Sequence, residues 1–423
     1  MNYVHRVVDS ELDALLRELP AISLEGARGV GKTATAERRA ATAFYLDDPA
    51  QRTLAEAGPG ELLSNETPIL IDEWQRVPAV WDAVRRAVDR GARPGSFILT
   101  GSATPSDAPT HSGAGRIATL QMRPMSLAER QIGEPTVSLS ELLSGKQSDL
   151  KGHSACSLAN YVDEIVRTGF PGIRSLSDRA LRRQLDGYLS RIIEADFQEQ
   201  GHPVRRPSIL SAWLRAYGAA TATTASLETI RDAATGGQGD KPARKTTEPY
   251  RDVLSRLWIL DPLQPWIPSR NTLNRLTHSP KHHLVDPGIA VRLLGVDGTA
   301  LLSGDEAGDL IAERGDLLGN LFESLVAQSV RAYAPAAEAN VYHLQLHGGR
   351  HEVDLIVERG DGKVVAIEVK LGGSVGDGDV AHLTWLRDQI GSNLLDAIVI
   401  YTGPAAYRRP DGIGVVPGTL LGP

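Results

Sequence analysis

The stretch that decides the fold of the first part of the chain is residues 25–36, EGARGVGKTATA, which follows the apolar run PAISL. Its spacing fits G-x-x-x-x-G-K-[ST], in which glycines let backbone N–H groups close around phosphates without a Cβ clash. The positions concerned are Gly26, Gly29, Gly31, Lys32 and Thr33. An apolar strand before the loop and helix-forming residues after it would place the phosphates at a helix N-terminus, where the dipole favours anions. The stretch therefore predicts a site for ATP, with Lys32 at the β- and γ-phosphates and the Thr33 hydroxyl on Mg²⁺.

A second strand supplies the carboxylates that such a site needs. The apolar run Ile69–Ile71 ends in Asp72 and Glu73, and the carboxyl end of a buried parallel strand is where open α/β sheets place ligands. We expect Asp72 to bind Mg²⁺ and Glu73 to orient and polarise the water that attacks the γ-phosphate. A protein that only binds nucleotide has no need of a water-activating acid. The pair therefore favours an ATPase over a scaffold without turnover.

A third predicted strand, SFILTGSA at residues 96–103, ends in hydroxyl side chains. Thr100 or Ser102 could contact the γ-phosphate or the attacking water, and a strand running into a turn is the equal alternative. The following loop, rich in Pro, Gly and Ser, ends at Arg116. That cation could stabilise transition-state charge in its own site or in a neighbouring subunit's site, or form a surface ion pair. A homo-oligomer is therefore a candidate assembly.

Composition limits the remaining functions. A chain of 423 residues is too long for one core, and its net charge of −7 argues against a uniformly basic coat for nucleic acid. No apolar run is long enough to span a bilayer, and the N-terminus lacks the apolar stretch of a signal peptide. The single cysteine, Cys156, allows no internal disulfide. We expect a cytoplasmic protein without a membrane partner.

The middle of the chain is predicted to be mostly helical. Three helical segments, at 207–221, 226–235 and 246–266, with a strand expected at the end of the last, favour a winged helix-turn-helix. Lys241, Arg244 and Lys245 precede or open the third segment and could touch DNA phosphates. The alternative is a solvated loop in a helical packing module, which the small size of this basic cluster favours.

The C-terminal part carries a second set of charged residues. An amphipathic helix bears Glu323, and two strands around a GDGK turn predict a hairpin with Asp354 on one strand and Glu368 and Lys370 on the other. Glu368 and Lys370 share a face because side chains alternate along a strand, and Asp354 can meet them across the hairpin. These charges could hold Mg²⁺ and position a water for phosphodiester hydrolysis. A buried network that only holds the hairpin together is the alternative.

Several motifs, in order, resemble those of the predicted AAA-type P-loop ATPases of bacteria and archaea that carry a poorly characterised C-terminal domain. They include GARGVGKT, ILIDEWQRVP, LTGSA, RTGFPG and SPKHHLVDPGIAVRLL. The C-terminal pattern resembles the PD-(D/E)xK restriction-endonuclease-like fold, although Val353 stands where the motif's name has proline. That resemblance implies Glu323 as an auxiliary acid, Asp354 and Glu368 as metal ligands, and Lys370 as a water-orienting cation.

The fold expected from these patterns is α/β with three domains. They are a P-loop AAA-type ATPase domain at 1–135, a helical and winged-helix-like domain at 150–295, and a nuclease-like α/β domain at 310–423. Two functions follow from this organisation. In the first, ATP hydrolysis switches a Mg²⁺-dependent nuclease that acts on DNA or RNA. In the second, the chain is an ATP-driven signalling switch whose inactive nuclease-like domain binds a partner or nucleic acid.

Overall fold

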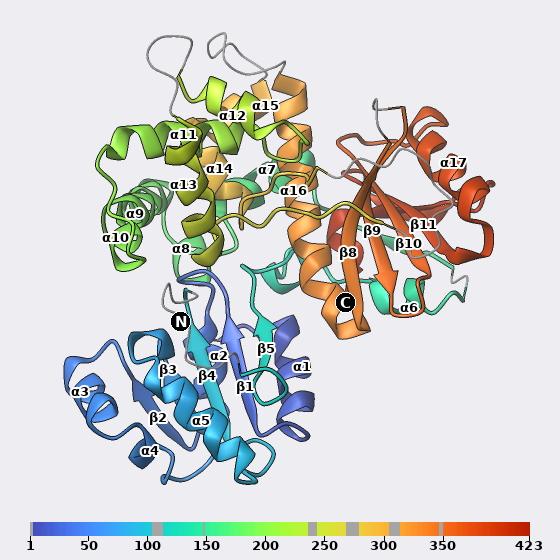
Figure 1. Ribbon diagram of the computed structural model, residues 1–423. Coiled ribbons are helices and arrows are strands. Elements are labelled where there is room, and N and C mark those ends of the chain that lie inside the picture. The colour runs from blue at the N-terminus through green and yellow to red at the C-terminus, as the bar shows by residue number, and fades with distance from the viewer. Residues whose placement is uncertain are drawn as a thin grey trace.

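The computed structural model (Figure 1) describes residues 3–103, 113–146, 149–235, 243–267, 279–303, 314–346 and 350–423. It contains two large sheets, one N-terminal and one C-terminal, with a group of helices between them in the sequence. None of the helices in these ranges is long and apolar enough to cross a membrane.

The N-terminal sheet has five parallel strands in the order β2-β3-β4-β1-β5. They are β1 (Ala21–Glu25), β2 (Thr42–Tyr45), β3 (Ile69–Asp72), β4 (Phe97–Gly101) and β5 (Ala118–Gln121). The three central strands are apolar and almost fully buried, as parallel sheets covered on both faces require. The nearby helices are α1 (Val7–Leu16), α2 (Lys32–Glu37), α3 (Pro49–Ala57), α4 (Pro59–Leu62) and α5 (Ala79–Asp89). Because the strands are parallel, their carboxyl ends meet at one edge, and the glycine-rich loop lies there between β1 and α2.

The middle of the chain is helical, as predicted. Its helices are α7 (Leu158–Arg167), α8 (Pro171–Arg174), α9 (Asp178–Arg191), α10 (Phe197–Glu199), α11 (Pro207–Ala219), α12 (Leu227–Ala233), α13 (Arg244–Arg256), α14 (Pro287–Leu294) and α15 (Gly298–Ser303). A π-helical turn at Ile192–Asp196 joins α9 to α10. Buried apolar side chains of these helices share one core with side chains of the N- and C-terminal parts.

The segment after α13 forms a short ribbon rather than a regular strand. Antiparallel bridges join Leu260 to Leu284 and Leu263 to Lys281, and we call residues 259–265 and 281–285 the ribbon. Three helices followed by this ribbon have the element order expected of a winged helix, but a parallel bridge from Pro265 to His343 ties the ribbon to the C-terminal sheet. DNA binding by this part stays a prediction, and Lys241 lies outside the described residues.

The C-terminal sheet has seven strands in the order β7-β12-β13-β11-β10-β9-β8. Its main elements are α16 (Arg314–Tyr333), β8 (Ala339–Gln345), β9 (Glu352–Arg359), β10 (Val364–Lys370), α17 (Ala381–Ile390), β11 (Leu394–Tyr401), β12 (Ala405–Arg408) and β13 (Gly414–Pro417). Strands β9 and β10 are antiparallel, with Ile367 opposite Leu355, so the predicted hairpin is confirmed. Strand β11 continues the sheet parallel to β10.

The segment that follows the first sheet packs against the C-terminal part. Strand β6 (Val137–Ser138) pairs with β14 (Leu421–Gly422), and β7 (Gly152–His153) pairs with β12. Helix α6 (Leu139–Leu143) lies between them in the sequence. The first residues of the predicted middle domain, from 150, therefore pair with the C-terminal sheet, which a sequence boundary drawn from helical periodicity did not anticipate.

Candidate functional site

The glycines of the loop at residues 26–31 are required by its backbone. Gly26 has a φ of +154°, and a Cβ added there would lie 2.1 Å from the carbonyl oxygen of Met122. Gly31 has a φ of +106° and caps the N-terminus of α2. L-residues with a side chain rarely adopt these conformations. The sequence therefore permits a tight loop that wraps the start of a helix, which is the arrangement that binds phosphate.

Lys32 is buried inside this loop. Its Nζ donates hydrogen bonds to the carbonyl oxygens of Gly26 (2.7 Å) and Ala27 (3.0 Å). Burial lowers the pKa of Lys32 to about 8, against the opposing effect of the carboxylates of Glu73 and Asp72. The amine therefore already lies in the loop, held by main-chain oxygens.

Asp72 and Thr33 come together at the end of the sheet, as predicted from the sequence. The Thr33 hydroxyl donates to Asp72 Oδ1 over 2.8 Å, and Thr100, at the end of β4, donates to the same oxygen. Burial raises the pKa of Asp72, although both hydroxyls oppose this effect. A hydroxyl and a carboxylate side by side are oxygen ligands of the kind that Mg²⁺ prefers, so the residues present fit this ion.

Glu73 begins a short turn after β3 with a φ of +54°, a conformation that is uncommon for glutamate. Its Oε2 accepts a hydrogen bond from Ser102 Oγ over 2.7 Å and another from the Gln75 amide. Ser102 also accepts from the Gln75 amide over 3.2 Å. The turn thus holds the Glu73 carboxylate against the end of β4, and Gln75 is a contact that the strand pattern did not predict.

A cavity of about 800 Å³ lies over the loop and is lined by parts of the chain that are distant in sequence. Lys32, Thr33, Asp72 and Glu73 form one side, while Pro171 and other residues from the start of α8 contribute to another. The N-terminal residues 3, 4 and 6 also line it. A ligand held by the loop would therefore contact the first helices of the middle part as well.

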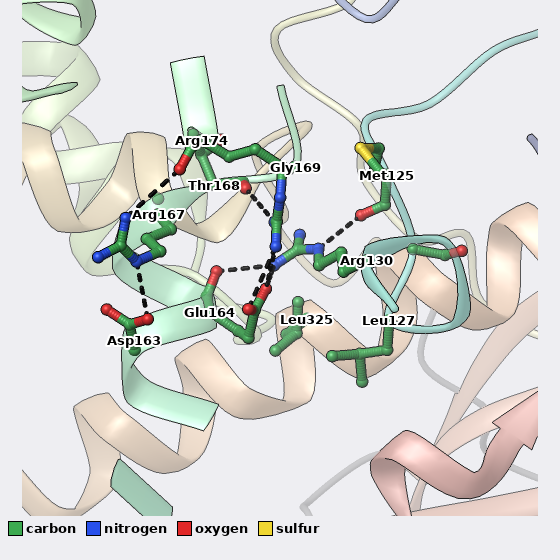
Figure 2. A network of polar contacts seen from close by, with 12 residues as sticks. Met125, Leu127, Arg130, Asp163, Glu164, Arg167, Thr168, Gly169, Arg174 and Leu325 are labelled. Atoms are coloured by element: carbon green, nitrogen blue, oxygen red, sulfur yellow. Dashed lines mark hydrogen bonds and ion pairs between the residues drawn. The ribbon is translucent and has the colours of Figure 1, made fainter. Parts of the chain in front are cut away.

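Four arginines that sequence analysis missed also line this cavity, namely Arg6, Arg28, Arg130 and Arg174. Figure 2 shows the contacts of Arg130 and Arg174. Arg130 is fully buried and donates to the carbonyl oxygens of Met125 (2.8 Å) and Glu164 (2.7 Å). Arg174 donates to the Glu164 carboxylate (3.0 Å) and to the carbonyl of Thr168 (3.0 Å). These contacts join the end of the N-terminal part to α7 and α8, and no local spacing in the sequence indicates them.

Arg116 does not reach the cavity of its own chain. Its Nε pairs with Asp89 Oδ1, at the end of α5, over 2.9 Å, and its side chain is 47% exposed. The described residues that line the cavity do not include it. The prediction that Arg116 acts in its own site is therefore wrong for this chain in the described conformation, because a surface carboxylate holds it elsewhere. A role in a neighbouring subunit stays a prediction.

A second hollow, of about 490 Å³, lies at the first half of α16, the start of β9 and the end of β10; we call it the acidic hollow. All four residues predicted from the sequence line it, namely Glu323, Asp354, Glu368 and Lys370. Lys370 Nζ donates to Glu368 Oε1 over 2.8 Å, and the backbone N–H of Val369 donates to Asp354 Oδ2 over 2.9 Å. The predicted convergence of these side chains therefore occurs.

Lys281, from the ribbon, lies at the centre of these carboxylates. Its side chain is 1% exposed, and its Nζ lies 2.8 Å from Glu323, 2.7 Å from Glu352 and 3.1 Å from Asp354. Burial alone would lower the pKa of Lys281, but the three carboxylates outweigh it and raise that pKa well above its ordinary value. In the described part of the chain, no three His, Cys, Asp or Glu side chains are grouped as ligands of a metal ion. Sequence analysis did not predict Lys281 or Glu352 here.

The carboxylates outnumber the nearby cations, and this affects their protonation. Burial and the charge of Asp354 raise the pKa of Glu323 to about 8, against the effect of Lys281. Burial and Asp354 likewise raise the pKa of Glu368 to about 8, against the effect of Lys370. Both glutamates therefore tend to hold a proton at neutral pH, which brings the net charge of the hollow closer to zero.

Comparison with known proteins agrees with the geometry of the N-terminal part. The model of a family described as "AAA domain" matches residues 18–131. Models described as "Domain of unknown function (DUF8612)" and "Domain of unknown function (DUF4143)" match residues 158–300 and 318–421.

Two similar whole proteins are described as uncharacterized. Two uncharacterized proteins, from Mycobacterium bovis and Mycobacterium tuberculosis, are each 26% identical over 374 residues, which is 85% of this chain and 72% of the relative. A solved structure of the Walker-type ATPase of Pyrococcus abyssi is 16% identical, covers 69% of this chain and 96% of its own, and has a TM-score of 0.41. That score is too low to transfer a fold or a function. The family match and the loop geometry together support a P-loop, ATP-binding domain of the AAA type in the N-terminal part of the chain.

Proposed function

We propose that the N-terminal domain hydrolyses ATP in a Mg²⁺-dependent reaction. The observation that carries this proposal is the placement of the Glu73 carboxylate against Ser102, next to the contact between Thr33 and Asp72. A binding loop alone explains affinity for ATP. A second carboxylate, held beside the oxygen ligands but not bonded to them, is what water activation requires.

The side chains have distinct tasks in this reaction. Thr33 and Asp72 would hold Mg²⁺, which supplies positive charge against the phosphates. Lys32 would exchange its carbonyl acceptors in the loop for phosphate oxygens. Glu73 accepts a proton or a hydrogen bond from the attacking water, and Ser102 keeps that carboxylate in place.

Replacing Glu73 by Gln tests this assignment. We expect Glu73→Gln to keep ATP bound and to lower the turnover rate by about 10²-fold or more, because the amide cannot act as a base. Lys32→Ala should lose ATP binding itself. The matched control is Glu66→Gln, which changes an exposed glutamate just before the same strand. Unchanged turnover in Glu73→Gln would show that this residue has no part in hydrolysis.

We further propose that ATP controls the C-terminal part through the helices between them. Residues of α8 line the nucleotide cavity, and Asp286 at the start of α14 accepts a hydrogen bond from the backbone of Gly169 over 2.7 Å. Arg130 Nη2 lies 3.7 Å from the same aspartate. Asp286 directly follows the ribbon, so a displacement of α8 by a ligand has a packed route to Lys281.

The C-terminal domain is either a nuclease or a binding module, and the position of Lys281 favours a binding module for a partner or nucleic acid. Its ammonium uses the oxygens of Glu323 and Asp354 that a metal ion would need. The test is the full chain with Mg²⁺, with and without ATP, against labelled single- and double-stranded DNA and RNA. We expect intact substrates. Cleavage that disappears in Lys370→Ala, but not in the exposed control Lys151→Ala, would instead identify an ATP-controlled nuclease.

The oligomeric state decides whether the nucleotide site is complete in one chain. We propose a homo-oligomer as the active form, because each of the four arginines that line the cavity is held by a carboxylate of the chain itself, so that a partner's cation could add positive charge at the leaving phosphates. Light scattering with and without a non-hydrolysable ATP analogue measures the oligomeric state directly. A chain that turns over ATP as a monomer would remove the need for a partner's cation.

A further inference from the structure

The cation at the centre of the acidic hollow comes from outside the C-terminal sheet. Lys281 belongs to the ribbon, and its backbone N–H donates to the carbonyl of Leu263 over 2.9 Å. The carboxylates around it belong to α16 and β9. The side chain that fills the hollow and the oxygens that bind it are therefore on separate elements.

The hollow also retains an unused oxygen. Glu368 is 6% exposed, and its Oε2 has no hydrogen-bond partner among the residues that the structure describes. A buried carboxylate oxygen without a partner is costly, and each such atom in a native protein calls for an explanation. Within the described ranges, the cations that pair with Glu323, Glu352, Asp354 and Glu368 are Lys281 and Lys370. The unpartnered Glu368 oxygen, in the same hollow as the oxygens of Glu323 and Asp354, indicates a site suited to a more strongly charged cation than an ammonium.

We propose that Lys281 and a divalent cation are alternative, mutually exclusive occupants of the acidic hollow, so that Lys281 keeps metal out while the ribbon is packed in place. With Lys281 withdrawn, Asp354 Oδ1 and Glu323 Oε1 lose the hydrogen bonds from its ammonium and join Glu368 Oε2 as oxygens open to a cation. Three carboxylate oxygens of this kind are a hard-cation site. The inference rests on the placement of these oxygens around Lys281, and it does not depend on ATP hydrolysis.

Ion pairs to two other parts of the chain hold the ribbon in place. Asp261, on the ribbon, pairs with Arg123 of the N-terminal part over 3.0 Å and with Arg331 of α16 over 2.7 Å. The position of Lys281 is therefore set by the junction of the three parts of the chain. Metal binding in the hollow would report on the state of that junction.

The experiment measures binding of Mn²⁺ to the full chain without nucleotide, by calorimetry and by the electron paramagnetic resonance of free Mn²⁺. The key variant combines Lys281→Met with Glu352→Gln, which removes one cation and one anion and so preserves the net charge of the hollow. We expect it to bind one Mn²⁺ at least about tenfold more tightly than the wild type. Adding Asp354→Asn should abolish that gain.

Lys281→Arg is the matched control, because it keeps the positive charge, and it should gain no Mn²⁺ site. Circular dichroism verifies folding, and Mn²⁺ should raise the melting temperature of the double variant but not of the wild type. The proposal is overturned if the folded double variant binds no Mn²⁺, or if the wild type binds Mn²⁺ equally tightly through Asp354. ATP binding measured on the same samples separates this failure from a failure of the ATPase assignment.

Discussion

Asp261→Asn is the substitution that most directly tests how the three parts of the chain are held together. Asp261 accepts hydrogen bonds from Arg123 Nε (3.0 Å) and Arg331 Nη2 (2.7 Å), and all three side chains are at most 15% exposed. The carboxylate is the shared counter-ion of two guanidinium groups from opposite ends of the chain. Asparagine keeps the size of the side chain but removes its charge.

The expected loss of stability can be estimated in two ways. Burial alone would raise the pKa of Asp261, but Arg123 and Arg331 outweigh it and lower this pKa from 3.8 to about 2. That shift corresponds to about 2 kcal/mol of unfolding free energy. Removing one partner of a buried ion pair costs about 3–5 kcal/mol, because the remaining charges stay buried. We therefore expect a loss between about 2 and 5 kcal/mol, or a melting temperature lower by about 2–6 °C for a chain of 423 residues.

The effect should depend on pH in a definite direction. Because the folded-state pKa of Asp261 lies below the unfolded value, its contribution is fully present at neutral pH and is lost as pH falls from about 3.8 through about 2. The gap in stability between wild type and Asp261→Asn should therefore narrow by about 1 kcal/mol between pH 7 and pH 3. Urea unfolding, followed by circular dichroism at both pH values, measures this difference in the free energy of unfolding.

Asp252→Asn is the control, since this aspartate on α13 is 65% exposed and lies 3.8 Å from Arg251. Its effect should stay within about 0.5 kcal/mol. A melting temperature for Asp261→Asn within about 2 °C of the wild type at pH 7 would refute the reasoning. A difference in stability between the wild type and Asp261→Asn that grows toward pH 3 would refute the low pKa assigned to Asp261.

Three further substitutions probe the nucleotide site. Gly26→Ala should abolish ATP binding, because the added Cβ would lie 2.1 Å from the Met122 carbonyl oxygen. The control Gly60→Ala, which has open space around it, should bind ATP as the wild type does. Equal ATP binding by the two variants would contradict the loop geometry. Arg174→Ala should weaken ATP binding in a filter assay by about tenfold, because it removes a charged contact at a partly exposed site. Unchanged affinity for ATP would show that α8 does not contact the ligand. Arg116→Ala should leave turnover within about twofold, since it removes a surface ion pair, and a larger loss would place this arginine in a neighbouring subunit's site.

The local motifs of this chain could be interpreted from the sequence because their chemistry depends on short spacings. The loop glycines, Lys32 and Thr33 lie within eight successive positions. An apolar strand that ends in Asp72 and Glu73 is expected to place these carboxylates at the carboxyl edge of a parallel sheet, where ligands bind. The hairpin at β9 and β10 was predictable for the same reason, since alternation and a tight turn determine which side chains face each other.

The ribbon and the domain junctions could not be predicted in this way. Lys281 is 73 positions from Asp354, Arg130 is 34 from Glu164, and Arg123 is 138 from Asp261. At such separations no helical or strand period relates two residues. Each of these charged residues, taken alone, is of a type that is usually found on the protein surface. Only burial makes the pairing obligatory, because a charge removed from water must find a counter-charge.

The sequence by itself determined that the chain binds nucleotide phosphates and that acidic residues converge in its C-terminal part, because both follow from local backbone geometry. The tertiary structure decided what occupies that acidic hollow and which arginines reach the nucleotide cavity. It did so by packing the ribbon and α8 against the two sheets, and that packing depends on shape and buried charge summed over the whole chain.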